Sequence, residues 1–117
     1  HFINQKNFIM RLILKGIGAS PGIALGKVKV ILNEKDFGKM KKSCILVTIM
    51  TNPFFVPLMQ KASGIITDVG GLLCHAAIVA RELGIPCVVG TKKATEVLKD
   101  DMKVKIDGKN GEVYLVK

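Results

Sequence analysis

The sequence lacks the residues that build several common kinds of site. It has no tryptophan, 5% aromatic residues and two arginines among 117 residues. Nucleic-acid surfaces commonly interleave arginine with aromatic side chains, so this composition argues against a nucleic-acid partner. No apolar run approaches the roughly 20 residues of a membrane span, and the opening stretch has no secretory signal pattern. We therefore expect a cytoplasmic protein with no membrane partner.

The cysteines are few and badly spaced for cross-linking. Cys44, Cys74 and Cys87 are the three in the chain, and none forms a CxxC pair. An odd number without close pairing is not the disulfide framework of a small secreted domain. A zinc site conventionally uses four ligands in close pairs, and only Cys74 and His75 are neighbours. The sequence therefore predicts reduced thiols and no metal site.

Basic residues outnumber acidic ones, giving a net charge of +9. The net charge is +3 over residues 1–15, +4 over 16–50, zero over 51–90 and +2 over 91–117. This distribution predicts lysine-rich solvated faces around a neutral central segment, and it does not favour binding to nucleic acid.

The length and a hydrophobic content of 49% predict one domain with a sizeable core. We assign residues 1–11 to a tag, a linker or a disordered N-terminus, and residues 12–117 to the domain. Strand-length apolar runs alternate with helical patterns, which predicts a compact α/β domain with a mixed β-sheet and two or more helices. Strands are expected within 12–31 around a glycine-rich turn at 16–22, at 44–48, 64–67 and 86–89, and as a hairpin at 103–107 and 112–116. Helices are expected at 53–62, capped by Thr51 or Asn52, and at 76–83, while 33–43 is expected to be a loop or short helix.

His75 is the residue most suggestive of chemistry. It follows Gly70 and Gly71 and begins a helix with Ala76 and Ala77, so an anion can approach the backbone beside an uncrowded ring. The N–H groups of a helix N-terminus favour a phosphate at that place. A neutral imidazole is a competent nucleophile, so the site could form a phosphohistidine. From the residues alone, a helix cap or a partly buried polar histidine is the favoured interpretation, because a match of this length is weak evidence for a site.

The segment 70–90 (GGLLCHAAIVARELGIPCVVG) resembles the signature of the mobile domain of phosphoenolpyruvate-utilising enzymes. This family includes phosphoenolpyruvate synthase, pyruvate phosphate dikinase, enzyme I of the sugar phosphotransferase system and rifampicin phosphotransferase. The turn at 15–22, the segment 46–57 with its Met-Thr-x-Pro pattern, and the hairpin at 107–116 also resemble the family. The resemblance covers about residues 14–116 and implies the swivelling phosphohistidine type of fold.

What the resemblance implies is a phosphoryl-carrier domain of a phosphoenolpyruvate synthase-like phosphotransferase, with His75 as the phosphorylated nucleophile. The ATP-grasp nucleotide-binding domain and the phosphoenolpyruvate/pyruvate-binding barrel would be its partners, in cis or in trans. The carrier itself would hold no cofactor, with Mg²⁺ and ATP bound by the partner domains. The candidate residues of a phosphate cradle, inferred from their positions around His75, are Gly70, Gly71, Cys74, Ala76 and Arg81.

Leu73 departs from the family pattern, in which synthases, dikinases and enzyme I usually have threonine two residues before the histidine. An apolar residue there also resembles the rifampicin-phosphotransferase branch. Two alternatives therefore stay open: a carrier domain of an enzyme of that branch or another relative, and a non-catalytic regulatory or binding module with the same fold.

Overall fold

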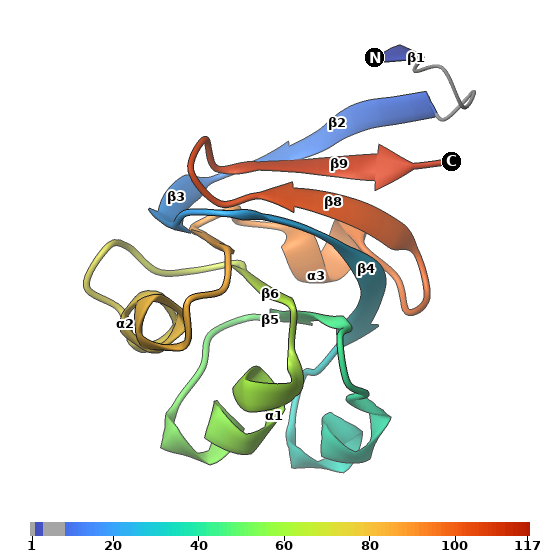
Figure 1. Ribbon diagram of the computed structural model, residues 1–117. Coiled ribbons are helices and arrows are strands. Elements are labelled where there is room, and N and C mark those ends of the chain that lie inside the picture. The colour runs from blue at the N-terminus through green and yellow to red at the C-terminus, as the bar shows by residue number, and fades with distance from the viewer. Residues whose placement is uncertain (1, 4–8) are drawn as a thin grey trace.

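The computed structural model describes residues 2–3 and 9–117 (Figure 1). Within these residues nine strands form one mixed sheet in the order β1-β2-β9-β8-β4-β5-β6-β7-β3. The strands are β1 (Phe2–Ile3), β2 (Ile9–Lys15), β3 (Ile17–Ser20), β4 (Ile23–Val30), β5 (Ile45–Thr48), β6 (Gly64–Thr67), β7 (Cys87–Val89), β8 (Lys103–Asp107) and β9 (Glu112–Val116). The helices are the 3₁₀ helices η1 (Glu34–Lys39) and η2 (Pro53–Phe55) and the α-helices α1 (Val56–Lys61), α2 (His75–Leu83) and α3 (Ala94–Val97). The α/β class with a mixed sheet is confirmed.

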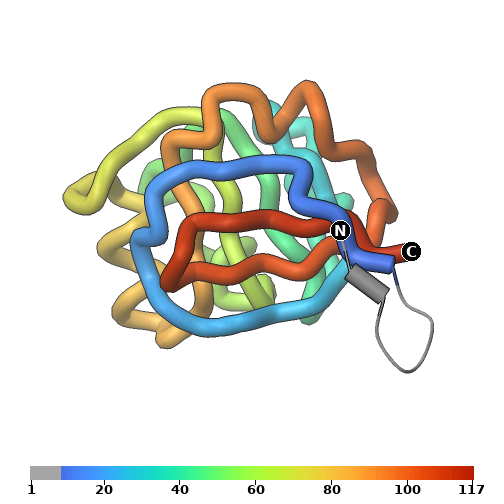
Figure 2. The backbone as a smooth tube through the Cα atoms, turned by 90° about the horizontal axis from the view of Figure 1, so that it is seen from above, coloured from blue at the N-terminus to red at the C-terminus, as the bar shows by residue number. Residues whose placement is uncertain are grey.

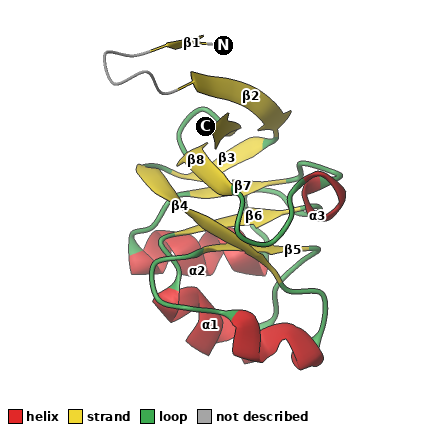
Figure 3. Ribbon diagram, turned by 90° about the vertical axis from the view of Figure 1, so that its right-hand side faces the viewer, coloured by secondary structure: helices red, strands yellow, loops and turns green. Residues whose placement is uncertain are grey.

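Strand β4 divides the sheet into two halves. Residues 23–27 pair antiparallel with β8, whereas residues 28–30 pair parallel with β5. The antiparallel half contains β1, β2, β9, β8 and the start of β4, and the parallel half contains the end of β4 with β5, β6 and β7. Helices α1 and α2 lie on one side of the parallel half and the antiparallel half lies on the other (Figure 3). Seen from above, the β8–β9 hairpin covers the parallel strands (Figure 2).

The parallel strands are buried on both faces, as their continuous apolar sequences predict. Successive residues of β5 alternate between two cores: Leu46 packs with α1 and α2, while Ile45 and Val47 pack with the antiparallel half. The same alternation places Ile65 in the first core and Ile66 in the second. Every residue of β5, β6 and β7 is buried, so the polar chemistry beside these three strands lies in the loops at their ends.

Helix α2 begins at His75 and packs through small residues. Ala76, Ala77 and Ala80 are buried against the parallel strands, and their size allows the helix axis to lie close to the sheet. Gly84 ends the helix with a left-handed φ of 71°, a conformation that favours glycine. The predicted helix at 76–83 is therefore present and one residue longer at its start.

Two differences from the sequence expectations concern the N-terminal third. The glycine-rich segment 16–22 is expected to be a turn, but Ile17–Ser20 form strand β3, which pairs antiparallel with β7. The domain is expected to begin at residue 12, but β2 begins at Ile9. The expected tag, linker or disordered segment at 1–11 also covers residues 1 and 4–8, which lie outside the described residues. In the part of the chain that the structure describes, no helix is long and apolar enough to cross a membrane.

Candidate functional site

His75 lies at the carboxyl-terminal edge of the parallel strands, where loops meet. The loop after β6 leads into α2 and ends at His75, and the loop after β5 brings Thr51 beside it. Thr51 Oγ1 and His75 Nδ1 are 2.8 Å apart and hydrogen-bonded, and Thr51 is buried. Asn52 caps η2 by accepting from the Phe54 N–H, so the Thr51 hydroxyl is left for the imidazole.

A small hollow of about 200 Å³ opens beside the imidazole. Both loops and the first turn of α2 contribute to its lining, which consists of Met50, Thr51, Val69, Gly70, Cys74, His75 and Ala76. The first N–H groups of a helix have no partner within that helix, so the start of α2 offers donors and a partial positive charge at this place. The hollow is thus a small anion-compatible site with an imidazole in its wall.

The two adjacent glycines of this loop have different structural roles. Gly70 has a φ of 130°, and a methyl group on it would lie 2.8 Å from Cys74 Sγ. Gly71 has nothing within 4 Å of the position that a methyl group would take. The loop therefore requires glycine at 70, where the chain turns across Cys74, and tolerates a side chain at 71.

Arg81 fixes the position of the same loop through hydrogen bonds to two backbone carbonyls. Its Nη2 donates to the Leu72 carbonyl at 2.8 Å, and its Nη1 donates to the Ala19 carbonyl in β3, also at 2.8 Å. The guanidinium thus ties the loop before His75 to the edge strand of the sheet. Of the five cradle candidates, Gly70, Cys74 and Ala76 line the hollow with His75, while Gly71 and Arg81 do not.

The cysteines divide by environment. Cys87 lies in the core, and burial, with a smaller contribution from Cys74, raises the pKa of its thiol to about 12 although Arg81 acts in the opposite direction. Cys44 is buried as well, and only Cys74 reaches the hollow. Among residues 2–3 and 9–117, no three His, Cys, Asp or Glu side chains gather as metal ligands would.

Thr51 is not among the site residues expected from the sequence, where it stands only as a possible helix cap and as part of the Met-Thr-x-Pro pattern. It stands 24 positions before His75, and only the parallel pairing of β5 with β6 brings the two following loops together. The available signal is its place directly after a buried strand, because the carboxyl ends of parallel strands meet at one edge.

Comparison with known proteins gives consistent matches. A family model described as "PEP-utilising enzyme, mobile domain" matches residues 40–111. A probable phosphoenolpyruvate synthase of Archaeoglobus fulgidus is 62% identical over 104 residues, which are 89% of this chain and 14% of that protein. The phosphoenolpyruvate synthase of Pyrococcus furiosus is 59% identical over 88% of this chain and 13% of its own length.

A solved structure agrees with these matches. The solution structure of Enzyme I (nEIt) superposes with a TM-score of 0.58 at 31% identity, covering 69% of this chain and 33% of that one. The chain therefore shares its fold with part of that structure, and it spans 14% and 13% of the two synthases named above.

Proposed function

The chain belongs to the PEP-utilising enzyme, mobile domain family, and from this membership we propose that it is the phosphoryl-carrier domain of a phosphoenolpyruvate synthase-like enzyme. His75 is the carrier residue. The observation that supports this most directly is the bond between His75 Nδ1 and Thr51, at the mouth of a hollow formed by a helix N-terminus. The names of the curated relatives favour phosphoenolpyruvate synthesis over antibiotic phosphorylation.

The hydrogen bond to Thr51 assigns separate roles to the two ring nitrogens. When Nδ1 carries the proton and donates to Thr51 Oγ1, Nε2 keeps its lone pair, and among the described residues it has no hydrogen-bond partner. A neutral imidazole with this tautomer has its nucleophilic nitrogen free. Nε2 is therefore the atom that takes up the phosphoryl group.

The transfer is two displacements at phosphorus. In the first, the Nε2 lone pair forms the N–P bond while the bond from phosphorus to the donor's leaving oxygen breaks, and that oxygen keeps the electron pair. The ring becomes cationic, and the Nδ1–H donated to Thr51 then makes a charge-assisted hydrogen bond. In the second, an acceptor oxygen attacks phosphorus, the N–P bond breaks, and its electron pair returns to Nε2.

The start of α2 would cradle the phosphoryl group. The free N–H groups of its first turn would donate to the anion, and Gly70 has no side chain to block its approach. Cys74 and Ala76 line the same hollow. Gly71 and Arg81 do not line the hollow: Arg81 holds the loop in place through the Leu72 carbonyl, and position 71 tolerates a side chain. The carrier keeps no cofactor in this proposal, and no acidic side chain lines the hollow to hold a metal.

The rest of the reaction belongs to other domains. The chain spans 14% of the length of the A. fulgidus relative, so a complete enzyme of this kind has ample length for further domains. We assign ATP with Mg²⁺ to an ATP-grasp domain and pyruvate or phosphoenolpyruvate to a barrel domain. The carrier would move between them in a cytoplasmic enzyme.

The test uses the complete polypeptide that carries this chain, called the parent enzyme below. On incubation with ATP or with phosphoenolpyruvate, intact-mass analysis should show a phosphate that is acid-labile and base-stable. We expect His75→Ala to remove it. The matched control is His1→Ala, which changes the chain's other histidine and should leave the phosphate in place. Absence of phosphate from the wild type, or its survival in His75→Ala, would contradict the proposal.

A further inference from the structure

The loop between β6 and α2 contains two adjacent glycines, Gly70 and Gly71. Glycine has more backbone freedom than any other residue, and a pair without side chains cannot be held on one path by side-chain packing. The path of this loop matters because Val69 and Gly70 line the hollow of His75. The glycine pair therefore needs an anchor on each side.

Two hydrogen bonds to backbone carbonyls provide these anchors. On the α2 side Arg81 donates to the Leu72 carbonyl. On the β6 side the Thr67 hydroxyl donates to the Val69 carbonyl at 2.7 Å. This carbonyl belongs to the planar peptide that joins Val69 to Gly70, so the bond fixes the plane of that peptide and the direction in which the chain enters Gly70. The positive φ of 130° at Gly70 begins from this fixed plane.

Thr67 is itself held firmly. It is the last residue of β6 and is 0% exposed, and its carbonyl accepts from both the N–H and the hydroxyl of Thr91, at 3.1 and 3.0 Å. The two N–H groups that follow Thr67 in the chain donate to the Thr48 and Ile49 carbonyls, each at 3.1 Å. These bonds continue the parallel pairing of β5 and β6 beyond the strands. The hydroxyl of Thr67 therefore acts from a fixed base on a segment that is tied to the loop of Thr51.

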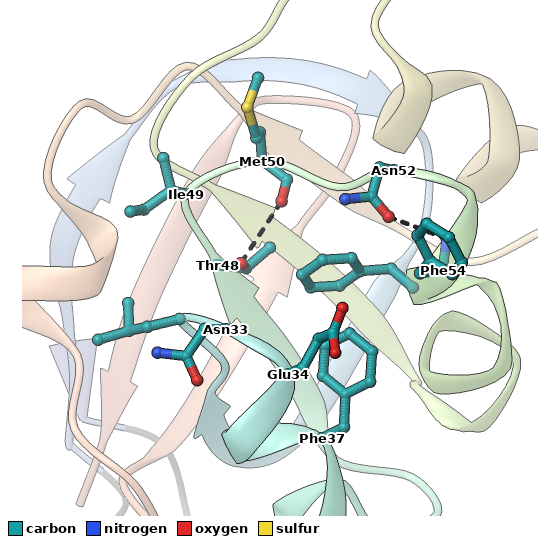
Figure 4. Close-up of a pocket in the computed structure, with 10 residues that line it drawn as sticks. Asn33, Glu34, Phe37, Thr48, Ile49, Met50, Asn52 and Phe54 are labelled. Atoms are coloured by element: carbon teal, nitrogen blue, oxygen red, sulfur yellow. Dashed lines mark hydrogen bonds between the residues drawn. The ribbon is translucent and has the colours of Figure 1, made fainter.

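The neighbouring strand offers a matched threonine with a weaker contact. Thr48 ends β5, pairs in register with Thr67 and is 1% exposed. Its hydroxyl also faces a carbonyl two residues further along, that of Met50, but at 3.5 Å (Figure 4). Hydroxyl hydrogen bonds are commonly about 2.7–2.8 Å long, so Thr67 makes a full bond where Thr48 makes a weak one.

We propose that Thr67 is a positioning residue for phosphoryl transfer: through the Val69 carbonyl, its hydroxyl gives the glycine loop the course that opens the hollow beside His75. This inference rests on the proposed function. Thr67 does not line the hollow and acts through Val69 and Gly70, which do. Without the bond the peptide between these two residues is free to rotate, and the loop spends less time in the form that admits an anion.

The experiment compares three substitutions in the parent enzyme. Thr67→Val keeps the shape and removes the hydroxyl, Thr67→Ser retains the hydroxyl, and Thr48→Val removes the weaker contact. Phosphoramidate transfers its phosphoryl group to Nε2 of His75 and releases ammonia without a partner domain, so its rate reports on the hollow alone. We expect this rate to fall about three- to tenfold in Thr67→Val, the effect of one lost hydrogen bond, and to stay within about twofold of the wild type in the other two variants.

Hydrogen exchange separates positioning from a general loss of stability. Measured by mass spectrometry, amide exchange of residues 69–74 should accelerate in Thr67→Val, while exchange of β5 and β6 stays at the wild-type rate. Thr67→Ala also lacks the hydroxyl and should show the same slower phosphorylation and the same local exchange, so the test does not depend on the folding of one variant.

Three results would overturn the inference. They are a wild-type rate in Thr67→Val, an equal loss of rate in Thr67→Ser or Thr48→Val, and faster exchange of β5 and β6 together with the loop. Failure of the proposed function is distinct, because the wild type would then carry no phosphate on His75 with any donor.

Discussion

The parallel and antiparallel halves of the sheet are built from strands of similar length but differ in how many faces of those strands are buried. In the parallel half β5 and β6 are buried along their whole length, and their polar neighbours are displaced to the carboxyl edge. In the antiparallel half one face is covered and the other carries lysines, with Lys105 lying over the Tyr114 ring at 5.4 Å. The difference teaches why the site is where it is: complete burial of the parallel strands leaves only their terminal loops for chemistry, at the edge where ligands bind in open α/β sheets.

The halves are joined by close contact between two glycine-rich segments. The Gly16 N–H donates to the Gly111 carbonyl and the Gly108 N–H donates to the Gly22 carbonyl, each at 2.8 Å. A methyl group on Gly18 would lie 2.5 Å from the Gly108 carbonyl oxygen. The β8–β9 turn therefore braces β3, which in turn pairs with β7 and receives the Arg81 side chain.

Breaking this junction should have the largest effect on stability. In Gly108→Ala the new methyl group would overlap the Ser20 carbonyl oxygen and lie 2.9 Å from Pro86 Cβ, where backbone cannot move aside cheaply. We expect a loss of about 3 kcal/mol or more in the free energy of unfolding, measured by urea denaturation. The matched control is Gly38→Ala in η1, which has nothing within 4 Å and should change stability by less than about 0.5 kcal/mol. Similar losses in both variants would show that the halves are not joined by steric fit at Gly108.

A smaller and more local effect is expected at the paired glycines of the site. Gly70→Ala places a methyl group against Cys74 Sγ at a φ of 130°, so we expect a loss of about 1–3 kcal/mol together with a slower phosphorylation of His75. Gly71→Ala meets no atom within 4 Å and should preserve both stability and rate. Thermal unfolding and single-turnover phosphorylation measure the two properties. If Gly70→Ala and Gly71→Ala had the same stability and the same phosphorylation rate, the loop would not depend on the positive φ of Gly70.

Substitutions of Thr51 test the role of its hydrogen bond to His75 without disturbing the core of the parallel half. Thr51→Val keeps the shape and removes the hydroxyl, while Thr51→Ser retains it. A hydrogen bond to a group that becomes charged is worth about 1.5–3 kcal/mol, so we expect the valine variant to be phosphorylated about 10- to 100-fold more slowly and the serine variant nearly normally. Nitrogen NMR of the imidazole should show Nδ1–H as the main tautomer only where the hydroxyl is present. A valine variant with the wild-type rate and tautomer would remove Thr51 from the mechanism.

Much of the parallel half could be predicted from the sequence. Its strands are continuous apolar runs bounded by glycine, proline and threonine, and α2 combines a small-residue stripe with a glycine stop, so local pattern and tertiary role agree. The same pattern predicts a helix start at Ala76, one residue after the observed start at His75. These elements fix where the candidate site lies, which is why His75 could be singled out from the sequence.

The remaining features depend on contacts that no local pattern carries. Strand β3 lies in a segment rich in glycine and proline, and it exists because it pairs with β7, which lies 67 to 72 residues further along the chain. The Thr51 hydroxyl meets His75 because Asn52, not Thr51, caps the following helix. Arg81 looks like an exposed helix residue in the sequence, and its two carbonyl contacts arise only once β3 and the His75 loop are both placed.

The smallest expected effect is a difference between the two halves in how their stability responds to acidic pH. The pKa values of Asp100 and Asp107 are lowered: burial opposes the shift, but the hydrogen bond from Lys39 to Asp100 and those from Asn110 and the Lys109 N–H to Asp107 outweigh it. Asp100 lies shortly before β8 and Asp107 is its last residue, whereas the loop after β5 contains no acid and the loop after β6 contains one, Asp68.

A carboxyl whose folded pKa lies below its unfolded value of about 3.9 stabilises the fold above that pH and loses this contribution as the pH falls further. On acidification below about pH 4, amide exchange of the β8–β9 hairpin should therefore accelerate before that of β5 and β6. Asp107→Asn should lower stability at neutral pH by less than about 1 kcal/mol and flatten this acid dependence, because the substitution removes the titrating group. Simultaneous loss of protection in both halves, or an unchanged acid profile in Asp107→Asn, would mean that the antiparallel half does not carry the acid sensitivity of the domain.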